Sequence, residues 1–113
     1  MKTVINRAEL QQRLEAGVPT IVLEALPEKY YVDGHLPGAL QLNHENVLQD
    51  AQRLAPDKNA TIVVYCASDT CKNSDITATR LEAMGYEDVR VYVAGKKDWL
   101  EAGLPVVRGD RAV

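Results

Sequence analysis

Short β-branched and aromatic runs alternate with helical patterns along this chain, and the connections between them are short. The runs expected to be buried strands are residues 20–23, 39–42, 61–65 and 89–93. The helical patterns follow Asn6, which has capping-box spacing to Glu9, and recur at residues 28–32, 47–55, 72–84 and 96–102. Strands that alternate with helices pair in parallel through right-handed crossovers. The pattern therefore predicts an α/β fold layered around a parallel sheet.

Length and composition fit one soluble domain. The chain has 113 residues, of which 46% are hydrophobic and 26% charged, enough for one core and too few for two ordinary domains. We expect a single domain over residues 1–113, with its core at about residues 3–106 and a frayed tail from Arg108 to Val113.

Charge and hydropathy argue against several classes of partner. The net charge is −3 and no lysine or arginine cluster occurs, so no nucleic-acid partner is expected. No apolar run approaches the roughly 18–20 residues of a membrane span, and the N-terminus has no apolar signal segment, so no membrane contact is expected. Two cysteines without an export signal favour a reducing compartment, and the expected location is cytoplasmic.

Cys66 is the most informative single residue. It directly follows the apolar run 62–65 and precedes a polar stretch that leads into the helical pattern at 72–84. That is the carboxyl end of a strand, where α/β sheets bind ligands, and it faces a helix N-terminus, whose amides and dipole favour an anion. We therefore expect an exposed sulfur, a lowered pKa and a thiolate reactive at neutral pH. The alternative is a small buried apolar residue, as most free cysteines are.

Several stretches together resemble the single-domain rhodanese-like sulfurtransferase family. Asp-Gly-His-Leu-Pro-Gly-Ala at 33–39 is similar to the family's Gly-His-Ile-Pro-Gly-Ala signature. Ile-Val-Val-Tyr-Cys at 62–66 resembles its central strand and catalytic cysteine. Gly85-Tyr86 followed by Val89 resembles the family's helix stop and next strand, and residues 95–99 and 102–106 resemble its closing signature, all in the family's order.

The resemblance implies a three-layer fold with a central, mostly parallel sheet of about five strands flanked by helices. It also implies that Cys66 accepts a sulfane sulfur, carries it as a persulfide and yields it to a thiophilic acceptor. The implied active-site loop consists of Ala67, Ser68, Asp69, Thr70, Cys71 and Lys72. Loop amides would point inward and hold the charged terminal sulfur. The implied partners are a small-molecule or protein sulfur donor and a thiol acceptor, with no cofactor.

Near this loop the sequence departs from the family pattern. The first predicted strand runs into Glu24 where the family has Asp-Val-Arg; Glu24 can still accept hydrogen bonds behind the site, but the customary arginine is missing. The loop region is slightly longer than the common form and carries Asp69. An acid beside a thiolate raises its pKa and repels anionic donors, so thiosulfate is a doubtful donor, with Lys72 as the compensating cation.

Cys71 and two histidines are further candidates. Cys71, five residues after Cys66, is either a resolving thiol that forms a disulfide or passes sulfur onward, or a helix-cap residue. His35 is expected to hydrogen-bond its turn rather than act as a base. His44 either faces the same rim as Cys66 or is a solvated loop residue. A zinc site would need two paired motifs, and the set formed by Cys66, Cys71, His35 and His44 lacks the second one, so no metal is expected.

Two other functions stay open. Phosphatases and arsenate reductases of this fold hold an oxyanion in a Cys-x5-Arg loop. The span from Cys66 to Lys72 has that length, but lysine lacks the bidentate fork of arginine, and Asp69 would face the dianion. A catalytically idle regulatory or redox-sensing module is the other alternative, since one fold hosts several functions. The sequence names no donor, acceptor, pathway or oligomeric state.

Overall fold

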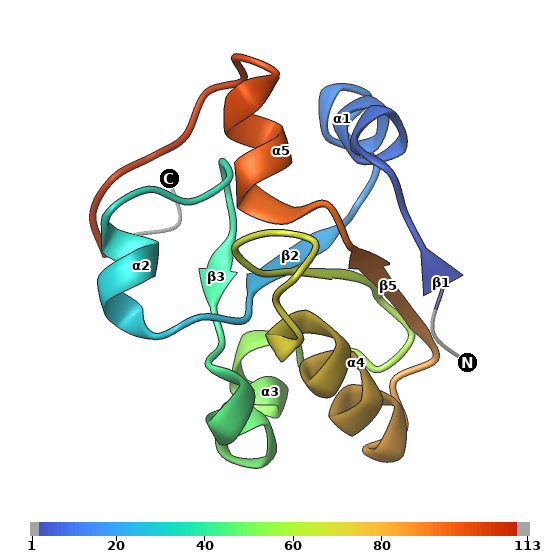
Figure 1. Cartoon of the computed structure of the whole chain (residues 1–113). Coiled ribbons are helices and arrows are strands. Elements are labelled where there is room, and N and C mark those ends of the chain that lie inside the picture. The colour runs from blue at the N-terminus through green and yellow to red at the C-terminus, as the bar shows by residue number, and fades with distance from the viewer. Residues whose placement is uncertain (1–2, 111–113) are drawn as a thin grey trace.

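One parallel sheet forms the centre of the computed structural model, which describes residues 3–110. Its five strands stand in the order β1-β5-β4-β2-β3 (Figure 1). Their bounds are β1 (Thr3–Val4), β2 (Ile21–Glu24), β3 (Leu40–Gln41), β4 (Thr61–Tyr65) and β5 (Asp88–Tyr92). β4 lies between β2 and β5, with Tyr65 in register with both Glu24 and Tyr92. The expected parallel sheet is confirmed.

Helices cover both faces of this sheet. They are α1 (Arg7–Glu15), α2 (Glu28–Val32), the 3-10 turn η1 (His44–Asn46), α3 (Val47–Leu54), α4 (Asn73–Ala83) and α5 (Gly95–Glu101). α3 and α4 lie on one face, and α1 and α5 lie on the other (Figure 1). α1 begins with the expected capping box, in which Asn6 and Glu9 exchange side-chain to backbone hydrogen bonds. The three-layer α/β architecture is therefore confirmed.

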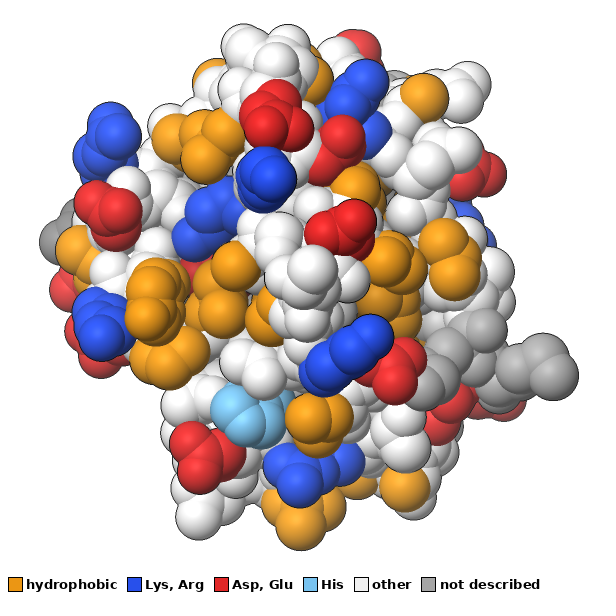
Figure 2. All heavy atoms as spheres, in the orientation of Figure 1, with side chains coloured by type: hydrophobic (Ala, Val, Ile, Leu, Met, Phe, Trp, Pro, Cys, Tyr) orange, Lys and Arg blue, Asp and Glu red, His pale blue; other side chains and the backbone are white. Residues whose placement is uncertain are grey.

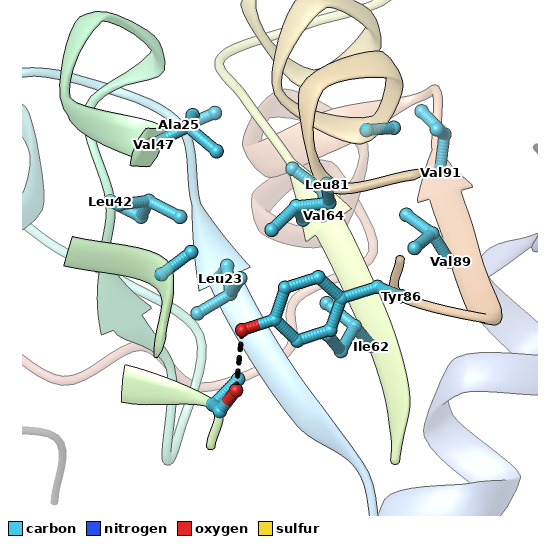
Figure 3. Packing of buried hydrophobic residues seen from close by; sticks show 13 residues of the cluster. Leu23, Ala25, Leu42, Val47, Ile62, Val64, Leu81, Tyr86, Val89 and Val91 are labelled. Carbon is cyan, nitrogen blue, oxygen red and sulfur yellow. Dashed lines mark hydrogen bonds between the residues drawn. The ribbon is translucent and has the colours of Figure 1, made fainter. Parts of the chain in front are cut away.

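Alternating strand residues build a separate core under each helical layer, because successive side chains of a strand point to opposite faces. Leu23, Val64 and Val91 pack beneath α3 and α4 with Leu81 (Figure 3). In the same cluster, the Tyr86 hydroxyl donates a hydrogen bond of 2.6 Å to the Ala55 carbonyl oxygen, drawn as a dashed line in Figure 3.

The core on the other face is built from the alternate positions of the same strands. Val63 and Tyr65 pack there with Leu10 of α1 and Trp99 of α5. The central strands are thus covered on both sides. This places the end of β4 between the two helical layers.

The two ends of the described chain differ from expectation. β1 was not predicted as a strand. It is a two-residue edge strand in which Val4 is 67% exposed, so its sequence shows no alternation of buried and exposed residues. Its pairing with β5 is what defines it as a strand. The tail expected to be frayed is held through Gly109, whose amide donates to the Val32 carbonyl oxygen at 2.9 Å. Just before it, Val107 forms an antiparallel bridge with His35. Residues 111–113 lie outside the described residues.

The surface carries charges of both signs. On the face shown in Figure 2, basic and acidic side chains are interspersed with hydrophobic ones, and no large basic patch gathers there. None of the helices within residues 3–110 combines the length and the apolar character needed to cross a bilayer.

Candidate active site

Cys66 directly follows β4 and lies against the first turn of α4, as its position in the sequence predicted. Its Sγ atom lies 3.4 Å from the Ser74 hydroxyl oxygen and 3.4 Å from the Cys71 carbonyl oxygen. The Ser68 carbonyl oxygen is 4.0 Å away. The residue is only 1% exposed, so the expectation of an exposed sulfur was wrong. Three oxygen atoms nevertheless lie within hydrogen-bond distance of the sulfur, more polar contact than an apolar core position offers.

The expectation of a lowered pKa was also wrong. Burial raises the pKa of the Cys66 thiol, and a hydrogen bond with the Cys71 side chain raises that pKa further. The hydroxyl and the backbone amide of Ser74 act in the opposite direction and lower the pKa. The amide that lowers this pKa thus belongs to α4 rather than to loop residues 67–72. The thiol can donate to the carbonyl oxygens that face it, which suits its protonated form.

The loop after Cys66 is held from behind by α5. The Lys96 amide donates to the Cys66 carbonyl oxygen at 2.9 Å, and the Lys97 amide donates to the Ala67 carbonyl oxygen at 2.8 Å. Gly95 makes this approach possible, since a Cβ atom there would lie 2.6 Å from the Cys66 carbonyl oxygen. Its φ of +73° is also one that glycine adopts readily. The N-terminal amides of α5 are therefore used to fix the loop backbone.

Glu24 anchors a buried polar network behind the loop. It is fully buried, and its Oε1 atom lies 2.8 Å from Nζ of Lys96 and 2.7 Å from the Tyr65 hydroxyl, which donates to it. The same hydroxyl accepts a hydrogen bond of 3.1 Å from the Leu36 amide. Lys96 also donates to the Tyr30 carbonyl oxygen at 2.9 Å. Glu24 thus holds Lys96, the residue whose amide donates to the Cys66 carbonyl oxygen. The Lys96 ammonium group is the cation beside Glu24.

The remaining loop side chains point to different surroundings. Ser68 and Thr70 bond to one another through their hydroxyls at 3.0 Å, on the exposed side of the loop. Asp69 and Lys72 are exposed. Burial, Cys71 and Ser74 shift the pKa of Cys66. Among the described residues Asp69 is not one of the causes, so the rise in that pKa expected from Asp69 is not observed. The hydroxyl that contacts the sulfur, at 3.4 Å, is that of Ser74, outside this stretch of the loop.

Neither histidine contacts the sulfur. His35 is buried and stacks on the Tyr31 ring with centroids 3.8 Å apart, and its Nδ1 atom lies 3.0 Å from the Tyr31 carbonyl oxygen. This confirms the structural role expected for His35. His44 opens η1, where its carbonyl oxygen accepts a hydrogen bond of 2.5 Å from Arg80. Within residues 3–110, no three His, Cys, Asp or Glu side chains come together as a metal site.

Two hollows border the loop on opposite flanks. One, of about 380 Å³, is lined by Ala67 together with Lys96, Lys97 and Arg108. The other, of about 480 Å³, is lined by Asp69 and Asp98, with Arg7 as its basic group. On the Ala67 flank, Lys97 and Arg108 are balanced by Asp33 and Glu101, and Lys96 is paired with Glu24, whereas the Asp69 flank carries an excess of negative charge.

Sequence reasoning missed the backbone anchors of the site. The hydrogen bonds from α5 to the loop and the Tyr65 hydroxyl network join segments about thirty or more residues apart, for which a single sequence has no pairing signal. Gly95 before Lys96 was the available clue, because a glycine at the start of a helix marks a close backbone approach.

Comparison with known proteins identifies relatives of this architecture. A family model described as a rhodanese-like domain matches residues 6–102. An HTH-type transcriptional regulator of Mycobacterium tuberculosis is 34% identical over 105 residues, which make up 93% of this chain and 45% of that protein. A candidate thiosulfate sulfurtransferase of Synechococcus elongatus is 28% identical over 95 residues, which make up 69% of this chain and 30% of that protein. The chain therefore spans less than half the length of either curated relative.

Solved structures give the same result. The solution structure of a rhodanese-like domain from an Anabaena protein is 28% identical, with a TM-score of 0.82. The match covers 97% of this chain and 82% of that one.

Proposed function

The chain belongs to the rhodanese-like domain family, and from this premise we propose that it is a sulfurtransferase that carries a sulfane sulfur as a persulfide on Cys66. The observation that carries the proposal is the position of the Cys66 sulfur at the end of β4, within 3.4 Å of the Ser74 hydroxyl in the first turn of α4. The hydroxyl and amide of Ser74 stabilise negative charge on sulfur, as the direction of their effect on the pKa indicates.

The proposed chemistry has two steps. The Cys66 thiolate attacks the sulfane sulfur of the donor; a bond forms between the two sulfurs, and the remainder of the donor leaves with the bonding electron pair. The terminal sulfur of the persulfide is then attacked by a thiophilic acceptor, and the electron pair returns to Sγ of Cys66. Because Cys66 is 1% exposed, the donor reaches it only when the loop shifts outward.

Donor and location belong to the same proposal. An anionic donor is disfavoured on the Asp69 flank, where Asp69 and Asp98 outnumber Arg7, and meets balanced charges on the Ala67 flank. A cytoplasmic location fits both cysteines being free thiols, as in a reducing compartment.

A regulatory role is the second candidate function. It is favoured by the 34% identity with a protein named as a transcriptional regulator, of which this chain spans 45%. An oxyanion hydrolase has less support, because carbonyl oxygens of Cys71 and Ser68 face the cysteine sulfur and would repel a phosphate dianion.

A parallel turnover assay separates these functions. The protein is incubated with a sulfane-sulfur donor and cyanide, and separately with a chromogenic phosphate ester. A sulfurtransferase forms thiocyanate, the Cys66→Ser variant forms none above background, and the ester stays intact. The Cys71→Ser variant is assayed beside them, because it keeps a persulfide that Cys71 could otherwise remove. Thiocyanate formation that is equal in wild type and Cys66→Ser, or absent from both wild type and Cys71→Ser with every donor tried, would exclude the proposal and favour the regulatory role.

A further inference from the structure

Cys66 and Cys71 are brought together inside the loop. The Cys71 amide donates to the Ser68 carbonyl oxygen at 3.1 Å, which closes a turn and brings the chain back over Cys66. The Cys71 carbonyl oxygen then lies 3.4 Å from the Cys66 sulfur. The loop therefore holds Cys71 beside the Cys66 sulfur before any reaction, as a disulfide between neighbouring residues requires.

The two thiols differ in their access to solvent. Cys66 is buried, whereas Cys71 is partly exposed at the loop surface. An external acceptor meets Cys71 and the loop before it meets Sγ of Cys66. The thiol placed to react first with a modified Cys66 is therefore that of Cys71, whose carbonyl oxygen already contacts Sγ of Cys66.

We propose that Cys71 resolves the Cys66 persulfide by forming a Cys66–Cys71 disulfide and releasing sulfide, an inference that rests on the proposed function. The Cys71 thiolate attacks Sγ of Cys66, the atom that its own carbonyl oxygen contacts, and forms the new sulfur–sulfur bond. The bond from Sγ to the terminal sulfur breaks, and its electron pair leaves with that sulfur.

The balance of this step needs no oxidant. A persulfide and a thiol give a disulfide and hydrogen sulfide, the thiol proton leaving with the released sulfur. In this step the terminal sulfur is reduced to sulfide and the Cys71 sulfur is oxidised to the disulfide level, which the Cys66 sulfur already has in the persulfide. A dithiol reductant, acting from outside on the partly exposed Cys71 sulfur, then restores both thiols and completes a cycle. In this cycle the domain converts sulfane sulfur into sulfide.

Intact mass after alkylation tests the proposal on the full chain. Wild type, Cys71→Ser and the control Gln52→Ala are treated without oxygen with inorganic polysulfide, desalted, alkylated and weighed. Gln52→Ala is the control because Gln52 is an exposed residue of α3, outside the loop. Wild type and Gln52→Ala are expected to gain no sulfur and to lose both alkylation sites, which dithiothreitol restores. Cys71→Ser is expected to keep one additional sulfur on Cys66.

The outcomes separate this inference from the proposed function. If wild type keeps the added sulfur on Cys66, or carries it on Cys71, the resolving step is wrong although sulfur transfer stands. If both wild-type thiols stay free while Cys71→Ser gains a sulfur, the resolving step is also wrong. If Cys71→Ser gains no sulfur, persulfide formation on Cys66 fails and the inference falls with it.

Discussion

At the scale of single residues, Gly95 controls how closely α5 approaches the loop. Replacing it with alanine would place a Cβ atom 2.6 Å from the Cys66 carbonyl oxygen and 2.9 Å from the Ser68 amide nitrogen, both of them backbone atoms. Gly95→Ala is expected to displace the loop and abolish sulfur loading, with a loss of stability well beyond the roughly 1–2 kcal/mol of left-handed backbone strain alone.

Gly103→Ala is the matched control for this substitution. Gly103 has a φ of +75°, against +73° for Gly95, but a Cβ atom there meets nothing within 4 Å. It carries the same backbone strain without the collision, so loading is expected to be unchanged. Denaturant unfolding and mass measurement of loading check both variants. Equal behaviour of the two would show that the approach of α5 is not what shapes the loop.

The Cys66 thiol gives a pH prediction with a definite sign. Because burial raises its pKa, the thiolate is scarce at neutral pH and forms as pH rises through a value above the ordinary one of about 8.5. Thiolate absorbance of Cys71→Ser, corrected with the Cys66→Ser/Cys71→Ser double variant, measures this midpoint. Ser74→Ala in the same background should move the midpoint higher, since Ser74 lowers the pKa. A midpoint below 8.5 would restore the expectation drawn from the sequence.

At the scale of elements, the ion pair between Lys96 and Glu24 joins α5 to β2 beneath the site. Lys96→Met would leave a fully buried carboxylate without its cation, which costs about 3–5 kcal/mol in comparable buried pairs. The double change Glu24→Gln/Lys96→Met removes the charge as well and should recover much of that loss.

Lys97→Met is the control for the ion pair, because Lys97 is the exposed neighbour of Lys96. Exposed substitutions usually stay within about 0.5 kcal/mol. Denaturant unfolding measures the four proteins side by side. If Lys96→Met cost no more than Lys97→Met, the buried pair would have no part in holding the loop.

The elements themselves could be predicted closely where burial gives a periodic signal. The expected strand at 61–65 is β4, and the helix expected at 72–84 is α4 with ends trimmed by one residue. β1 was missed because two exposed residues show no alternation. The site was predicted only in its position, since the depth of Cys66 depends on how α4 and α5 pack around it.

At the scale of the whole molecule, long-range pairing closes the fold around the site. The bridge between His35 and Val107 ties the segment after α5 back to the turn after α2. Such contacts between distant segments have no local sequence signature, which explains why the tail was expected to fray. The same reasoning applies to the loop, whose carbonyl groups are oriented by amides from α5.

The role of Cys66 as the residue that carries the transferred sulfur can be measured on one protein. Intact mass of Cys71→Ser is recorded after treatment with a sulfane-sulfur donor, because that variant cannot resolve the product. We expect a gain of one sulfur atom, located on the peptide that contains Cys66 and absent from the Cys66→Ser/Cys71→Ser double variant. A Cys71→Ser protein whose mass does not change, or an equal gain by the double variant, would show that Cys66 does not carry the sulfur.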